Sequence, residues 1–264
     1  MPYSLPIEAA TVPNLRDLGS IPLAGGRTVR PGLVLRSGQL DRFAPGADPL
    51  FDALGVRTVV DLRTDRERAA RPDVIPPGGR LVVADVLADL VSSGAASKLG
   101  TVMADPLAAN RLLGDGRAAE ALISDYRSFV AGDSGRAAYR TLLTELASPA
   151  DGPVLFHCTA GKDRTGWGAA LLLLLLGADP ATVEAEYLAV NPAVRAAFAP
   201  VVEAFTAAGG DPRVTEELLT VRPAYLAAAL ETLTDGWGDA ETYARTALGL
   251  TDETLDALRT NLTA

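Results

Sequence analysis

The chain has 264 residues, a formal net charge of −9 and a pI near 4.7, and 48% of its residues are hydrophobic. Phosphate backbones attract basic surfaces and repel acidic ones, so this charge argues against nucleic-acid binding and makes any phosphate site a local one. The single cysteine cannot form an internal disulfide, and with the single histidine it cannot complete a zinc site of the usual nitrogen and sulfur ligands. The usual zinc site is therefore excluded, and we predict no metal and no cofactor.

Short apolar runs in the first part of the chain predict strands. β-Branched stretches between turn residues cover positions 33–35, 56–62, 81–83 and 154–156. They indicate strands buried on both faces, which, with helical stretches between them, predict an α/β domain with a mostly parallel sheet flanked by helices. The ligand crevice of such a sheet lies at the carboxyl ends of the strands. Asp61 and the adjacent pair His157 and Cys158 occupy such ends.

Residues 86–130 form a predicted insertion within a single domain that spans 1–264. This segment is rich in alanine, leucine and small polar residues, and Gly94, Gly100, Gly114 and Gly116 break any long helix. We predict a few short helices here. Two interpretations stay open: an ordinary surface excursion, or a mobile lid beside the site.

The chain after Gly177 predicts helices only. Asp179 and Pro180 have the pattern of an N-cap followed by proline at the first helical position, and Thr251 precedes two acidic residues in a favourable first turn. One face of the last helix would carry Leu255, Leu258 and Leu262.

Neither a membrane span nor a secretory signal is predicted. The most apolar run, 167–178, has 12 residues, whereas a spanning helix needs about 20, so it indicates a core helix and no stable membrane insertion. The first ten residues lack the positive and apolar regions of a signal peptide. We expect a cytoplasmic protein, with export by a signal-less route as the alternative.

The stretch HCTAGKDRTG, at 157–166, joins the only cysteine to the only histidine and to one of the two lysines. Cys158 and Arg164 stand in a C-x5-R arrangement between a predicted strand and a helix expected to begin near Thr165. The N–H groups of so short a loop can point inward and form an anion nest at the positive end of the helix. Gly161 permits backbone angles that other residues resist, and the Arg164 guanidinium can bind two phosphate oxygens.

This setting also predicts the chemistry of Cys158. A cysteine at a helix N-terminus beside cations ionises more readily than a free thiol, so we expect a thiolate near neutral pH. A thiolate at the floor of a cup shaped for a tetrahedral dianion can attack phosphorus in line and form a phosphocysteine, which water then releases.

Other classes of site fit the residues less well. A papain-like pair needs His157 beside the sulfur, but neighbours on a strand point to opposite faces and the chain has no second histidine. A Walker A loop needs glycine in place of Phe156 and serine or threonine in place of Asp163. An inert buried thiol is the simplest alternative for a lone cysteine, and the accompanying Arg164 and Gly161 weigh against it.

The loop HCTAGKDRTG resembles that of the cysteine-dependent protein tyrosine phosphatases, specifically the atypical bacterial tyrosine and dual-specificity phosphatases that also accept phosphoinositides. The resemblance covers nearly the whole chain and implies their α/β fold. Ser20 replaces the second glycine of that family's NxRDLGG stretch, and Glu186 replaces an acidic partner that is usually Asp. The resembling segments are NLRDLGS at 14–20, RPG at 30–32, VVDLRTDRE at 59–67, EAEYLAVN at 184–191 and TYARTALGLTDETLDALR at 242–259.

The resemblance implies roles for the loop residues. Cys158 would be the nucleophile, Arg164 would clamp the phosphoryl oxygens, and His157 would steady the loop from behind. Thr165 would donate its hydroxyl toward the thiolate or assist water attack. Lys162 occupies a position that is basic in lipid-phosphate phosphatases and would favour multiply phosphorylated head groups; a solvated lysine is the alternative. Thr159, Ala160 and Gly161 would complete the substrate site.

The leaving-group oxygen needs a proton from a carboxylic acid. Asp163, inside the loop, is the first candidate, because its adjacency to Arg164 is fixed by the sequence. Asp61 is the second, because it ends a neighbouring strand. Each has a structural alternative: Asp163 would only cap the helix, and Asp61 would only fix a turn through Arg63.

The leading hypothesis is a phosphatase that acts on phosphotyrosine, with phosphoserine, phosphothreonine or phosphoinositides as further substrates. Its partners would be phosphorylated proteins or phosphoinositides. The alternatives are a phosphate-binding module without turnover, and a sulfurtransferase or arsenate reductase with a similar cysteine loop.

Overall fold

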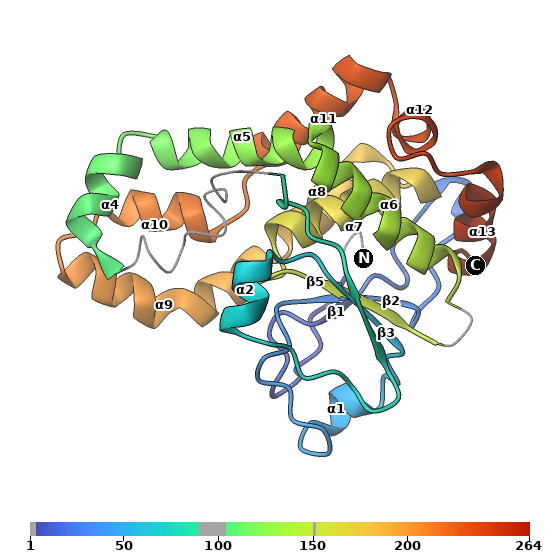
Figure 1. Cartoon of the computed structure of the whole chain (residues 1–264), viewed down its shortest axis with the longest axis horizontal. Coiled ribbons are helices and arrows are strands. Elements are labelled where there is room, and N and C mark those ends of the chain that lie inside the picture. The colour runs from blue at the N-terminus through green and yellow to red at the C-terminus, as the bar shows by residue number, and fades with distance from the viewer. Residues whose placement is uncertain (1–3, 90–103, 150–151) are drawn as a thin grey trace.

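The computed structural model describes residues 4–89, 104–149 and 152–264. A five-stranded sheet of order β1-β2-β5-β3-β4 lies at its centre (Figure 1). Only β1 runs antiparallel to its neighbour, which confirms the predicted mostly parallel sheet. The strands are β1 (Arg16–Asp17), β2 (Val34–Ser37), β3 (Thr58–Asp61), β4 (Arg80–Val83) and β5 (Val154–His157).

The four parallel strands end level with one another. Ser37 of β2 and Asp61 of β3 both align with His157 of β5, and Val83 of β4 aligns with Asp61. The segments that follow these strands therefore meet at one edge of the sheet, where an α/β fold binds its ligands.

Side chains of the inner strands alternate between two apolar layers, as the two-residue period of a strand requires. In β5, Val154 and Phe156 join the larger core, whereas Leu155 joins a smaller one that includes Phe51. Helices cover the first face, and α1 (Pro49–Asp52) lies on the other (Figure 1). The covering helices include α5 (Arg117–Ala131), α6 (Asp133–Ala147), α7 (Asp163–Leu176), α8 (Pro180–Leu188) and α11 (Pro223–Trp237).

The edges of the sheet differ from the prediction. We expected β4 to be buried on both faces, but Leu81 is 43% and Val83 50% exposed. The expectation was wrong because β4 pairs only with β3 and is an edge strand. The other edge strand, β1, is two residues long and therefore carries no detectable periodicity.

The C-terminal part is helical, as predicted. Asp179 caps α8 with Pro180 in its first turn, and Thr251 caps α13, whose three predicted leucines are buried. The apolar run 167–178 lies mostly in the buried helix α7. The remaining helices of this part are α9 (Asn191–Ala207), α10 (Pro212–Leu219), α12 (Ala240–Thr246) and α13 (Asp252–Leu262).

Within the described ranges, one helical stretch, Pro180–Ala207, has the length and composition that a membrane span needs, and 17% of its most apolar window is buried. This stretch includes α8 and α9. In the α8 part, Val183 and Tyr187 are buried in the main core, so this part of the stretch belongs to the folded domain.

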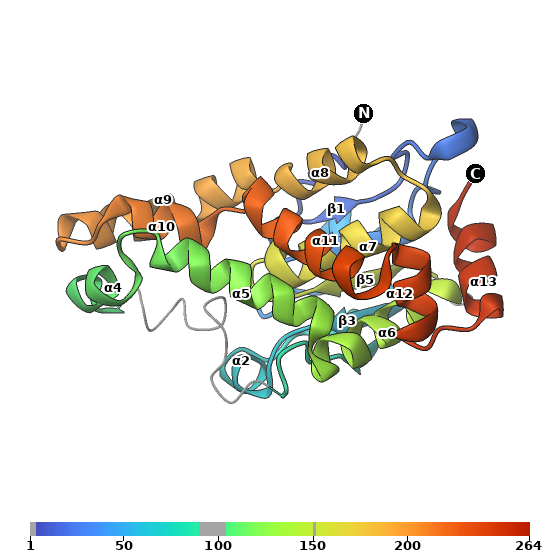
Figure 2. The same cartoon turned by 90° about the horizontal axis from the view of Figure 1, so that it is seen from above.

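The predicted insertion is helical where the structure describes it. It contains α4 (Pro106–Leu113) and α5, and with 15 residues α5 is longer than the short helices that we expected, because Gly116 begins this helix instead of breaking one. Residues 90–103, with Gly94 and Gly100, lie outside the described residues. Together with α9 and α10, α4 extends well beyond the sheet (Figures 1 and 2).

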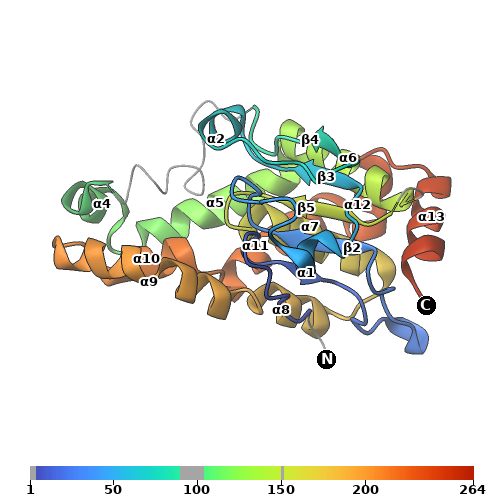
Figure 3. The same ribbon diagram turned by 90° about the horizontal axis from the view of Figure 1, so that it is seen from below.

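Helix α5 links this extension to the sheet. It runs from α4 toward the helices that pack on the strands (Figure 3). From Leu122 onward it carries the fully buried side chains of Leu122, Tyr126, Phe129 and Val130, all members of the main core. The end of the predicted insertion is therefore part of the scaffold around the site.

Candidate functional site

The stretch HCTAGKDRTG lies at the level edge of the sheet. β5 ends at His157, a loop follows from Cys158 to Lys162, and α7 begins at Asp163, two residues before the predicted start. Cys158 is 2% exposed and has no disulfide partner. The predicted strand, loop and helix are thus confirmed.

Neighbouring groups hold the carbonyl oxygens of the loop. These hydrogen bonds run from Gln39 N to Thr159 O (3.1 Å), from Asn14 Nδ2 to Ala160 O and Gly161 O (both 3.2 Å) and from Arg36 Nη2 to Gly161 O (2.8 Å). Within the part of the chain that the structure describes, no N–H group of 159–165 donates to a protein acceptor. The loop carbonyls are thus engaged and these N–H groups have no protein acceptor, which the predicted anion nest requires.

Gly161 is the residue that the loop geometry requires. Its φ is +68°, and a Cβ atom at this position would lie 2.2 Å from the carbonyl oxygen of Ser37. Any other residue here would be strained by the left-handed backbone conformation, and its Cβ would also collide with β2. The loop can approach β2 this closely only with glycine here.

The guanidinium of Arg164 is held by Glu67, the third residue of α2 (Asp65–Ala70). Arg164 donates to both carboxylate oxygens of Glu67, at 2.7 and 2.8 Å, and is 1% exposed. Thr159 Oγ1 donates to the same carboxylate at 2.5 Å, so Glu67 joins the two ends of the loop.

The ion pair between Glu67 and Arg164 shifts both titrations. Burial raises the pKa of Glu67, but the hydrogen bonds and charge of Arg164 outweigh burial and hold that pKa well below its usual range. Burial lowers the pKa of Arg164, and Glu67 in turn raises it above its ordinary value. Arg164 is therefore a fixed cation beside the loop.

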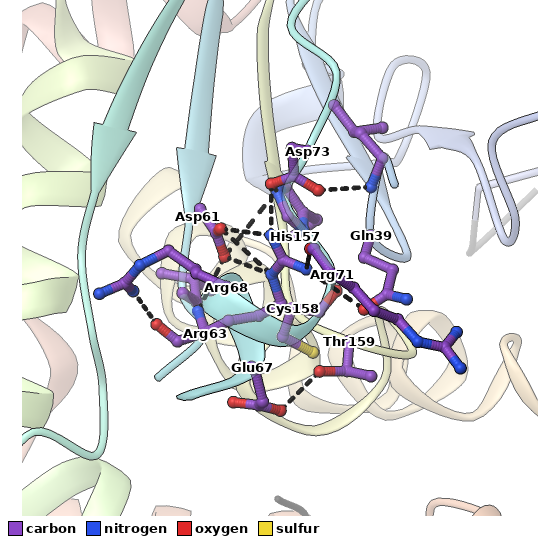
Figure 4. A network of polar contacts seen from close by, with 12 residues as sticks. Gln39, Asp61, Arg63, Glu67, Arg68, Arg71, Asp73, His157, Cys158 and Thr159 are labelled. Atoms are coloured by element: carbon purple, nitrogen blue, oxygen red, sulfur yellow. Dashed lines mark hydrogen bonds and ion pairs between the residues drawn. The ribbon is translucent and has the colours of Figure 1, made fainter. Parts of the chain in front are cut away.

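Behind the loop lies a buried polar network (Figure 4). Nδ1 of His157 lies 3.1 Å from the carbonyl oxygen of Cys158, and Nε2 lies 3.1 Å from Asp73 Oδ2, outside hydrogen-bond geometry. Burial raises the pKa of Asp73, but His157 and then Arg63 outweigh it and lower this pKa to about 2. His157 thus contacts the loop from behind, as expected.

Asp61 belongs to this network. Its carboxylate accepts hydrogen bonds from the Arg63 backbone and side chain, at 2.7 to 3.1 Å. These are the contacts of the structural alternative, in which Asp61 fixes a turn through Arg63. Asp61, Asp73 and His157 also lie close enough to hold a metal ion, but Arg63 Nη2 already pairs with Asp61 at 2.7 Å and Asp73 at 2.6 Å.

Asp163 has a different environment. It is 4% exposed, its Oδ1 accepts a hydrogen bond from Tyr126 at 3.1 Å, and its Oδ2 accepts one from Lys162 Nζ at 2.6 Å. The N-cap of α7 is Lys162, and no side chain caps this helix. Asp163 is therefore not a capping residue, and Lys162, which is 3% exposed, is not a solvated lysine.

Five buried side-chain nitrogen and oxygen atoms in or near the loop have no partner among the described residues. Thr165 Oγ1 and Arg164 Nε lie in the first turn of α7, and Arg36 Nε, His157 Nε2 and Trp167 Nε1 are the other buried atoms without a partner. Buried donors are normally paired, so this concentration of unpaired donors at one end of the sheet is compatible with an acceptor that the chain itself does not supply.

Several residues around the loop were missed by the sequence interpretation. Thr64 and Glu67 have the spacing of a capping box, and the structure contains this box, which could have identified the start of α2. The pairing of Glu67 with Arg164 spans 97 residues and leaves no local signal. The other missed residues are Asn14, Arg36, Asp73 and Tyr126.

Comparisons with known proteins agree with this geometry. The model of the Tyrosine phosphatase family matches residues 7–264. A protein of Cupriavidus necator named for tyrosine-protein phosphatase activity is 33% identical over 90% of this chain and 82% of its own length. The triple specificity protein phosphatase PtpB of Mycobacterium tuberculosis is 32% identical over 93% of this chain and 95% of its own length. A tyrosine-protein phosphatase of Nostoc commune is 30% identical over 58% of this chain and 46% of its own length.

Proposed function

Because this chain belongs to the tyrosine phosphatase family, we propose that it hydrolyses phosphate monoesters through a phosphocysteine formed on Cys158. The observation that carries this proposal is the run of N–H groups at 159–165 that have no acceptor among the described residues and that directly follow a buried cysteine, with Arg164 fixed by Glu67. A run of several free N–H donors suits a tetrahedral dianion better than a carbonyl substrate, because the dianion has several oxygens that accept hydrogen bonds.

In the first step the sulfur anion of Cys158 attacks phosphorus, an S–P bond forms and the P–O bond to the leaving group breaks. Asp163 gives its proton to the departing oxygen. The environment of Asp163 supports this role over Asp61, because among the described residues Asp163 Oδ2 is held only by the Lys162 side chain, whereas the Arg63 guanidinium holds both carboxylate oxygens of Asp61.

In the second step water attacks the phosphocysteine, the S–P bond breaks and the Asp163 carboxylate takes a proton from the water. Inorganic phosphate leaves. The buried hydroxyl of Thr165 has no acceptor among the described residues. A Cys158 thiolate would supply one, which supports a role for Thr165 in stabilising the thiolate as it leaves phosphorus.

For substrates, we propose phosphotyrosine first, with phosphoserine, phosphothreonine and phosphoinositides as further substrates. The name of the Mycobacterium tuberculosis relative, a triple specificity phosphatase, supports a broad range. Lys162 supports acceptance of a second phosphate, because its ammonium lies in the loop and needs only to exchange Asp163 for another anion.

Hydrolysis of p-nitrophenyl phosphate by the wild type and by Cys158→Ser tests the activity. We expect turnover by the wild type, its inhibition by vanadate, and none by the variant. Equal, negligible rates with retained phosphate binding would indicate a module without turnover, and arsenate reduction or sulfur transfer would indicate the other alternative. One preparation assayed on phosphotyrosine peptides, phosphoserine peptides and phosphoinositides then ranks the substrates.

A further inference from the structure

Two buried tyrosines contact the acid that the proposed mechanism uses. Tyr126 of α5 donates to Asp163 Oδ1 at 3.1 Å, and Tyr187 of α8 donates to the Tyr126 hydroxyl at 2.7 Å. All three side chains are buried. The chain of hydroxyls thus begins in the C-terminal helices, passes through the helix that ends the insertion and reaches the phosphate loop.

The direction of these hydrogen bonds is set by chemistry. An ionised carboxylate can only accept, so the Tyr126 hydroxyl must donate to Asp163, and its oxygen is left to accept from Tyr187. Burial raises the pKa of both tyrosines well above the ordinary value, so both hydroxyls keep their protons. Tyr126 is therefore a permanent donor to Oδ1.

The two oxygens of Asp163 are consequently not equivalent. A proton on Oδ1 would point at the Tyr126 hydroxyl, whose oxygen already accepts a hydrogen bond from Tyr187. The proton of the Tyr126 hydroxyl would then have no acceptor. A proton on Oδ2 has no such conflict once Lys162 leaves, because an ammonium is only a donor and cannot accept from a carboxylic acid. Oδ1 can accept from Tyr126 in both protonation states of Asp163.

We propose that Tyr126, fixed in turn by Tyr187, is a positioning residue that holds Asp163 by Oδ1 and so makes Oδ2 the oxygen that delivers the proton. This inference rests on the proposed role of Asp163 as the acid. The ring of Tyr126 is itself fixed, because it packs against Phe129 at 5.1 Å and Tyr225 at 5.9 Å between ring centres. The hydroxyl therefore has little freedom to follow a misplaced carboxylate.

The test measures kcat/KM on aryl phosphates with leaving groups that range from p-nitrophenol to phenol. The parameter kcat/KM reports the step that transfers phosphorus to Cys158, where the leaving group needs its proton. Tyr126→Phe removes only the hydroxyl. Tyr243→Phe is the matched control, because it removes another buried hydroxyl, which donates to Val130 at the end of the same helix α5, at 2.8 Å, and which does not contact Asp163.

With phenol as the leaving group, we expect Asp163→Asn to lower kcat/KM by about 10²- to 10⁴-fold, as expected for loss of an acid. Tyr126→Phe should lower it by about tenfold, a part of that contribution. With p-nitrophenol both losses should be much smaller, and Tyr243→Phe should follow the wild type throughout. Tyr187→Phe should give a weaker effect of the same kind, and it provides a second variant if Tyr126→Phe folds poorly.

The double variant separates this inference from the proposed function. If Tyr126 acts through Asp163, Tyr126→Phe should add nothing to Asp163→Asn. A leaving-group dependence for Asp163→Asn with none for Tyr126→Phe or Tyr187→Phe would overturn the inference and leave the acid assigned. A Tyr126→Phe effect that persists in the double variant would also overturn it. No dependence for Asp163→Asn would remove the acid assignment and the inference with it.

Discussion

Replacing Glu67 with glutamine should both destabilise the fold and misplace Arg164. The carboxylate pairs with both terminal nitrogens of the guanidinium, at 2.7 and 2.8 Å, and Arg164 Nε has no partner among the described residues. A glutamine of the same shape can accept from one nitrogen but turns a donor toward the other. Breaking a buried ion pair from one side costs about 3–5 kcal/mol. We expect Glu67→Gln to lower the free energy of unfolding by about 3 kcal/mol at pH 7. This is a large share of the about 5–15 kcal/mol that is typical of a folded domain.

The pH dependence gives a second measure of the same ion pair. The folded-state pKa of Glu67 lies below its ordinary value of about 4.5, so its stabilisation is present above this pH and is lost as the pH falls toward the folded-state pKa. The difference between wild type and Glu67→Gln should therefore be constant above pH ~5 and smaller by about 1.4 kcal/mol at pH ~3.5.

Urea unfolding of both proteins across this pH range measures the effect, and Glu241→Gln is the control. Glu241 also pairs with two arginines, Arg245 and Arg259, but on the surface, where such pairs contribute about 0–1 kcal/mol. kcat/KM of Glu67→Gln should fall by about 10²-fold, because Arg164 loses its fixed position. A Glu67→Gln variant as stable as Glu241→Gln at pH 7, with normal turnover, would refute the reasoning.

Three further outcomes are expected. Gly161→Ala should abolish turnover and lower the midpoint of thermal unfolding, because the new Cβ would collide with Ser37. Gly116→Ala is the control: Gly116 also has a positive φ but open space around it, so the substitution should lower the free energy of unfolding by only about 1–2 kcal/mol. Equal destabilisation by the two substitutions would contradict the collision. Cys158→Ser should lose turnover but still bind tungstate, measured by calorimetry, because the N–H groups are unchanged; loss of binding would argue against the nest. Asp73→Asn should be destabilised at pH 7 and approach the wild type as the pH falls below about 4, since the folded-state pKa of Asp73 is lowered to about 2; a constant difference in urea unfolding would contradict this.

The sequence predicted the features that depend on local patterns. Patterns of neighbouring residues were enough to predict the inner strands and the caps of α8 and α13. They also predicted the strand, loop and helix around Cys158. The exposure of β4 was not predictable in this way, because its apolar residues resemble those of an inner strand and only the strand order reveals an edge.

The site was predictable along the loop and not across it. HCTAGKDRTG identified the cysteine and the arginine, but the groups that hold them come from distant segments. Glu67 reaches Arg164 across 97 residues, and Tyr126 reaches Asp163 across 37. Such pairs follow from tertiary packing, and a single sequence carries no signal for which acidic residue or tyrosine will meet the loop.

The charges around the loop explain how an acidic protein can build a site for a dianion. The buried cations in and behind the loop are paired with carboxylates: Arg164 with Glu67, Lys162 with Asp163, Arg36 with Glu186, and Arg63 with Asp61 and Asp73. Among the buried lysines and arginines that the structure describes, only Arg16 has no carboxylate partner, so little unpaired positive charge is left there to attract phosphate from a distance. The attraction therefore comes from backbone N–H groups and the N-terminus of α7, which act over a few ångströms. Binding in this arrangement depends on the shape of the loop, so the net charge of −9 and a phosphate site do not conflict.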